Sequence, residues 1–200
     1  MIDIHSHTPG SNAIYNLTID ELRLSPPYID LEQRLSAGIH PWDVSEMWEK
    51  DFSYVKKWAS LHQVKAIGEC GLDNLVPSVY QEECFMAHIL LAEEVEKPLI
   101  IHCVKAVDAL LSIKKNLNPS QPWIFHGFRG KPQQAEQLLK AGFYLSFGEH
   151  FNPLSVQTCP IERLCIETDT SAWSIEEIEK RIQMIHLSTQ ESCAKDLFLK

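Results

Sequence analysis

Six side chains that commonly bind metal ions occur in or directly after short apolar stretches of this sequence. They are His5, His7, Glu69, His102, His126 and Asp169. A mixed set of imidazoles and carboxylates suits Zn, Mn or Fe better than Ca, with Mg less favoured. Two such ions about 3.5–4 Å apart activate water and stabilise the charge that develops during hydrolysis. The pattern therefore predicts a two-metal hydrolytic site.

These residues need strands that end on one face of the fold. Strands are expected from residue 2 and over 34–39, 64–67, 99–103, 123–125, 143–147 and 163–167, and 13–19 gives weak evidence for an eighth. Helices are expected over 45–59, 79–97, 106–115, 133–139 and 175–185, with another starting at residue 188 or 189. Alternating strands and helices indicate parallel βα units, and in a barrel of such units the strand ends converge.

The expected fold is an α/β, TIM-like (β/α) barrel that forms a single hydrolase domain over residues 1–200. A complete barrel typically needs about 250 residues, and only seven strands are readily identified. We therefore expect a distorted or incomplete barrel, with an abbreviated first unit and C-terminus. On the first expected strand, which starts at residue 2, His5 and His7 would point to the same side and could bind one ion together. Asp3 would face the same way.

Composition narrows the possible partners and compartments. The net charge of −9 argues against a broad basic surface for nucleic acid, although bound cations would make the site itself electropositive. The six cysteines include no C-x-x-C pair, which favours reduced thiols and a cytoplasmic location. Neither a signal peptide nor a membrane span is expected, and no obligate protein partner is evident.

Motifs in a fixed order then relate the chain to a known family. They are D-I-H-S-H (3–7), G-I-H-P (38–41), I-G-E-C-G-L-D (67–73), P-L-I-I-H-C (98–103), H-G-F-R-G (126–130) and R-L-C-I-E-T-D (163–169). The sequence resembles the TatD-type metal-dependent deoxyribonucleases of the amidohydrolase superfamily. The resemblance implies a (β/α) barrel that hydrolyses phosphodiester bonds, chiefly at DNA ends.

The resemblance also implies roles for individual residues. One ion would be held by His5, His7 and Asp169 and the other by His102 and His126, with Glu69 binding both ions. Asp169 and Glu69 would be catalytic, and Asp169 can also accept the proton of the attacking water.

Contacts to the substrate are less well defined by the motifs. His40 would either contact the scissile phosphate or pack its loop before Pro41. The family usually has an arginine directly after the residue that corresponds to Cys103, and then an acidic residue, whereas this chain has Val104 and Lys105. Lys105 or Arg129 could contact the phosphate instead, or could simply face solvent. The family's segment after residue 170 is absent.

Three functions remain open. The first is a TatD-like deoxyribonuclease or exonuclease, which the motifs favour. The second is a metal-dependent hydrolase of a small phosphoester, lactone or amide, which the acidic composition and the missing arginine favour. The third is a non-catalytic paralogue that keeps its metals for stability. The complete ligand set argues against the third.

Overall fold

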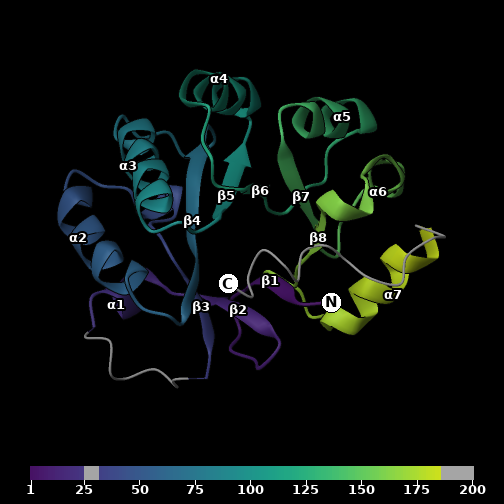
Figure 1. Cartoon of the computed structure of the whole chain (residues 1–200), viewed down its shortest axis with the longest axis horizontal. Helices are drawn as coiled ribbons and strands as arrows, with labels where there is room; N and C mark the ends of the chain where they lie inside the picture. The colour runs from purple at the N-terminus through teal and green to yellow at the C-terminus, as the bar shows by residue number, and fades with distance from the viewer. Residues whose placement is uncertain (25–31, 186–200) are drawn as a thin grey trace.

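Eight parallel strands close into a barrel in the computed structural model, which describes residues 1–24 and 32–185 (Figure 1). The strands are β1 (Asp3–Ser6), β2 (Ala13–Asn16), β3 (Arg34–Ala37), β4 (Val64–Asp73), β5 (Leu99–Val104), β6 (Trp123–Phe125), β7 (Phe143–Phe147) and β8 (Leu164–Ile166). Neighbours in the barrel are also neighbours in the sequence, and β1 pairs with β8 through Asp3 and Ile166 to complete the ring.

Helices lie outside this ring (Figure 1). They are α1 (Ile19–Leu22), α2 (Trp48–Ala59), α3 (Gln81–Glu94), α4 (Val107–Leu117), α5 (Pro132–Lys140), α6 (Pro153–Thr158) and α7 (Ile175–Ile185), with short 3-10 turns η2 (Pro41–Asp43) and η3 (Ile161–Arg163). In α2 the buried residues Trp48, Phe52 and Val55 recur every three or four positions, so one face packs on the barrel.

The TIM-like α/β barrel expected from the sequence is confirmed, but the expectation of an incomplete barrel with about seven strands is wrong. The weak segment 13–19 supplies the missing strand, β2, which pairs with β1 on one side and β3 on the other. The first unit is abbreviated as expected, because residues 7–12 join β1 to β2 without a helix. The helix expected after residue 188 lies outside the described residues.

Two apolar layers position the strand ends. A small cluster inside the barrel is formed by Ile2, Ile4, Ile14, Ala66, Ile100, Ile124 and Cys165. A larger cluster between strands and helices includes Leu99, Ile101 and Trp123. Because side chains alternate along a strand, His102 and His126 face the same side as Ile100 and Ile124, two positions earlier. Both histidines therefore face inward at the carboxyl end of the barrel.

Candidate metal centre

The predicted ligands converge around the carboxylate of Glu69. Its Oε1 lies 2.7 Å from His126 Nε2 and 3.0 Å from His102 Nδ1. Its Oε2 lies 3.2 Å from His5 Nε2 and 3.8 Å from His7 Nε2. The two oxygens thus face different pairs of imidazoles, which is the arrangement that a carboxylate bridging two ions requires.

His5 gives an independent test of whether these residues fit a cation. Its side chain is fully buried, yet among the described residues neither ring nitrogen makes a hydrogen bond. The short distance from Nε2 to Glu69 lacks hydrogen-bond geometry. A buried nitrogen without a partner is costly, and a cation held among imidazoles and carboxylates would remove that cost. The donor set is chemically suited to a transition metal.

Within residues 1–24 and 32–185, three groups of side chains are close enough to hold an ion. They are His5 with His7 and Asp169, His5 with Glu69 and His126, and His40 with Glu69 and His102. The first group agrees with the set that the resemblance implies for one ion. The second and third differ from the implied set for the other ion, because His102 and His126 fall in separate groups and His40 joins His102.

Asp169 is held in place by its own backbone. It adopts the left-handed conformation, with φ of 53°, which aspartate tolerates better than most residues. Its N–H donates to the carbonyl of His5, and its carbonyl accepts from the N–H of His7. The Oδ1 atom then lies 3.5 Å from His7 Nε2. Next to it, Thr168 donates its hydroxyl to the buried carboxylate of Asp3.

His102 has a partner behind it that sequence reasoning did not assign. Its Nε2 lies 3.0 Å from Asp73 Oδ2, which also accepts the indole N–H of Trp42 at 2.7 Å. A carboxylate on the far nitrogen fixes the tautomer and orientation of a ligating histidine. Trp42 is 63% exposed at the mouth of the site.

Glu167 does the same for His126. The carboxylate is buried, lies 3.3 Å from His126 Nδ1 and accepts the N–H of Gly127. Burial opposes charge on His126, but Glu69 and Glu167 outweigh it and raise its pKa well above the usual value. Burial also opposes charge on Glu69, yet the imidazoles of His126 and His5 hold its pKa well below the usual value.

Asn16 of β2 fixes the backbone of Glu69 through a hydrogen bond. Its Oδ1 accepts the N–H of Glu69 at 2.7 Å and the hydroxyl of Ser36 at 3.0 Å. Sequence reasoning missed Asn16, Asp73 and Glu167. Asp73 and Glu167 are part of the quoted motifs, but the sequence does not show which histidines they contact. Asn16 lies on the strand with the weakest pattern and gave no signal.

Five of the six predicted ligands, all except the buried His5, line a cavity of about 760 Å³ that also contains two of the three expected substrate contacts. His40 Nε2 lies 3.4 Å from Glu69 Oε1, while its Nδ1 accepts the N–H of Trp42. His40 therefore both reaches the site and caps its own loop. Arg129 is exposed on the cavity wall. Lys105 lies outside this wall and lines an adjoining cavity.

The sequence is similar to those of known proteins. The sequence model of the TatD related DNase family matches residues 28–182. An uncharacterized metal-dependent hydrolase, YabD, of Bacillus subtilis is 36% identical over 146 residues, 66% of this chain and 56% of the relative. The 3′-5′ ssDNA/RNA exonuclease TatD of Citrobacter rodentium is 32% identical over 153 residues, 67% of this chain and 56% of the relative.

Solved structures share the fold. The TatD homologue YjjV of Escherichia coli K12 superposes with a TM-score of 0.68 at 20% identity, over 92% of this chain and 80% of that one. A TatD family hydrolase of Entamoeba histolytica gives a TM-score of 0.62 at 22% identity, over 78% of this chain and 59% of that one.

The fold is a TIM-like barrel whose strand ends carry groups of side chains that could hold a metal ion, and the chain belongs to the TatD related DNase family. The chain spans about half the length of the curated relatives, 56% in the two cases above. The family match includes Glu69, His102, His126 and Asp169, whereas His5 and His7 precede it. No helix in the described ranges has the length and apolarity needed to cross a membrane.

Proposed function

We propose that this protein hydrolyses phosphodiester bonds in single-stranded DNA, at a site where His5, His7, Glu69, His102, His126 and Asp169 hold two divalent ions. The observation that carries the proposal is the split environment of Glu69, with one oxygen facing His5 and His7 and the other facing His102 and His126. The exonuclease name of the Citrobacter relative supports nucleic acid as the substrate class.

Divalent ions bound here would supply electrostatic stabilisation and lower the pKa of a coordinated water. The chain's own groups then have distinct tasks. Asp169 Oδ1 lies at the open side of the cluster and accepts the proton of the attacking water. Asp73 and Glu167 hold His102 and His126 in one orientation, so the ligands need not reorganise during turnover.

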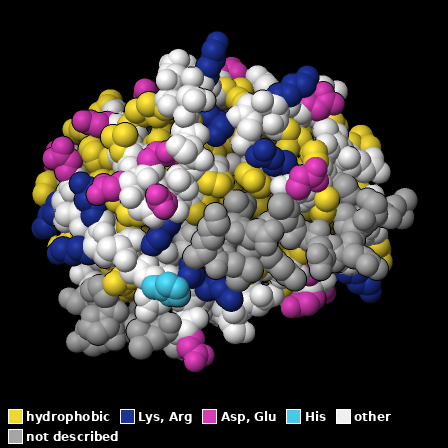
Figure 2. Space-filling view, in the orientation of Figure 1, with side chains coloured by type: hydrophobic (Ala, Val, Ile, Leu, Met, Phe, Trp, Pro, Cys, Tyr) yellow, Lys and Arg dark blue, Asp and Glu magenta, His cyan; other side chains and the backbone are white. Residues whose placement is uncertain are grey.

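One positive side chain, Arg129, is available for a phosphate at the cavity wall. The guanidinium of Arg129 makes no hydrogen bond or ion pair within the described residues. Arginine binds phosphate through two parallel hydrogen bonds, so it can fill the place of the family's missing arginine. Acidic and basic side chains are interspersed on the face in Figure 2, without a broad basic surface.

The test combines metal analysis with nuclease assays on the purified chain. Metal analysis of the wild type should find about two ions per chain, and Glu69→Gln should lose both. Release of nucleotides from labelled single-stranded DNA with Mg²⁺ or Mn²⁺ should fall by about 10²–10⁴-fold in Asp169→Asn. Glu162→Gln, at an exposed acid in the η3 turn, is the matched control and should behave as wild type.

Two other outcomes would replace the proposal. Turnover of a small phosphomonoester, lactone or amide without cleavage of DNA would indicate the alternative hydrolase. Two bound ions without hydrolysis of any substrate in the panel would indicate a non-catalytic protein that keeps metals for stability.

A further inference from the structure

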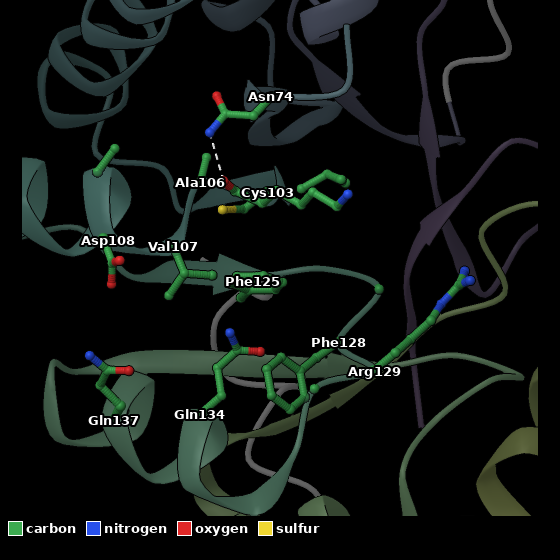
Figure 3. Close-up of a pocket in the computed structure, with 15 residues that line it drawn as sticks. Asn74, Cys103, Ala106, Val107, Asp108, Phe125, Phe128, Arg129, Gln134 and Gln137 are labelled. Atoms are coloured by element: carbon green, nitrogen blue, oxygen red, sulfur yellow. Dashed lines mark hydrogen bonds between the residues drawn. The ribbon is translucent and has the colours of Figure 1, made fainter. Parts of the chain in front are cut away.

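A second cavity of about 770 Å³ adjoins the metal centre between α4 and α5 (Figure 3). It shares a wall with the cavity that holds the ligands. The shared residues come from the ends of β5 and β6 and are Cys103, Val104, Phe125, Gly127 and Arg129. A substrate bound at the metal centre can therefore extend along this wall into the second space, which we call the α4–α5 cavity. Its size lies in the usual range for small-molecule sites.

Three side-chain amides are among its polar groups. Asn74, Gln134 and Gln137 line it, and Asn74 Nδ2 donates to the carbonyl of Lys105. Figure 3 shows the amide of Gln134 reaching from α5 toward Phe125 and Val107. This amide is half-buried and makes no hydrogen bond to any part of the chain that the structure describes.

The position of Gln134 depends on Gly130. A Cβ atom at residue 130 would collide with Gln134 Oε1 and would lie 2.7 Å from Phe128 Cζ. The glycine thus leaves room for the amide to lie along the cavity wall. An amide carries both donors and an acceptor, as the edge of a nucleobase does. A base in this cavity could therefore form two hydrogen bonds with Gln134.

The charges at the cavity also fit a nucleotide. Lys105 and Arg129 line it, and within residues 1–24 and 32–185 neither side chain forms an ion pair. Unpaired cations are notable in a chain with a net charge of −9. Asp108 is the one acid among the described lining residues, and it is exposed on α4. Phosphate oxygens would satisfy both cations.

We infer that the α4–α5 cavity binds the nucleotide next to the scissile phosphate of a single-stranded nucleic acid. The base lies against Gln134, and the phosphate group that links it to the metal centre lies against Arg129. This inference rests on the proposed function, because it extends the substrate of the same site.

Filling the cavity gives the sharpest test. Gln134→Trp places an indole in the space, while Gln133→Trp places it on the neighbouring exposed position of α5. Binding of a fluorescein-labelled oligothymidylate is measured by anisotropy in Asp169→Asn chains with Mg²⁺, where turnover is suppressed. Gln134→Trp should raise Kd about tenfold or more, the effect of overpacking a built site. Gln133→Trp should change Kd by less than about twofold.

A milder variant removes the amide without filling the space. Gln134→Leu should raise Kd by at least about fivefold, the loss expected for one of the two hydrogen bonds that the amide offers. In chains with Asp169 intact, kcat/KM for bis(p-nitrophenyl) phosphate should match the wild type in both Gln134 variants, because this diester carries no nucleotide.

The inference fails if Gln134→Trp and Gln134→Leu bind the oligonucleotide as tightly as Gln133→Trp. It also fails if they lose binding and small-diester turnover by the same factor. These results are separable from failure of the proposed function. An oligonucleotide that binds through Gln134 but is not cleaved by the wild type would overturn the nuclease activity and leave the subsite intact.

Discussion

Acidification should destabilise this protein through His88, a buried histidine behind the metal centre. Its Nε2 accepts the N–H of Ile39 at 3.0 Å, and its Nδ1–H donates to the carbonyl of Cys84 at 2.7 Å. Both nitrogens are therefore occupied in the neutral form. Burial lowers the pKa of His88 to about 4. Because Ile39 directly precedes His40, protonation of His88 would also disturb the loop that carries His40 into the site.

The expected loss of stability follows from proton binding. In the unfolded chain the pKa of His88 is near 6.5, whereas in the folded chain it is about 4. Between these two pH values the unfolded state therefore binds a proton that the folded state does not bind. Stability from neutral His88 is complete above pH 6.5 and declines as the pH falls from 6.5 to 4. At 1.36 kcal/mol per pKa unit, the loss between pH 7.5 and 4.5 is about 2.5 kcal/mol.

Urea denaturation across this range measures the effect, with His88→Gln as the control. Glutamine can accept from Ile39 and donate to Cys84 but does not titrate. The free energy of unfolding of the wild type should fall about 2.5 kcal/mol further than that of the variant between pH 7.5 and 4.5. The other titrating groups cancel in this difference. Parallel curves, within about 0.5 kcal/mol, would refute the reasoning.

Three further changes test the positions of individual groups. Glu167→Gln should weaken metal binding by about 10–100-fold, measured by chelator competition, because His126 loses its carboxylate partner; unchanged affinity would contradict this role. Gly38→Ala should lower the free energy of unfolding by about 1–3 kcal/mol, since a Cβ would lie 2.5 Å from Gly68 Cα; an unchanged thermal midpoint would show that the loop can move aside. Arg129→Gln should reduce the slope of log K against log salt for oligonucleotide binding by about 1; an identical slope would mean that Arg129 does not touch phosphate.

The strand ends could be predicted from sequence because their signals are local. Apolar runs such as Leu99–Ile101 indicate buried parallel strands, and the next residue must then lie at the carboxyl edge of the sheet. Closure of the barrel could not be predicted in the same way. Strand β2 has only four residues, Ala13–Asn16, and its pairing with β1 and β3 depends on contacts outside its own sequence.

The partners of the ligands were invisible for a related reason. Asp73 and Glu167 reach His102 and His126 across 29 and 41 residues, and only the registers of the strands bring them together. The same holds for the split of His102 and His126 between two groups, since the sequence gives ligand types but not distances. The residue types were therefore enough to predict a metal centre, whereas the grouping of its side chains in space could be seen only in the structure.

Anomalous diffraction from crystals soaked in Mn²⁺ or Zn²⁺ tests the central claim most directly. We predict two peaks about 3.5–4 Å apart, one on each side of the Glu69 carboxylate and each contacting ring nitrogens of the surrounding histidines. A cluster without a peak, or with Glu69 turned away from the bound ion, would contradict it.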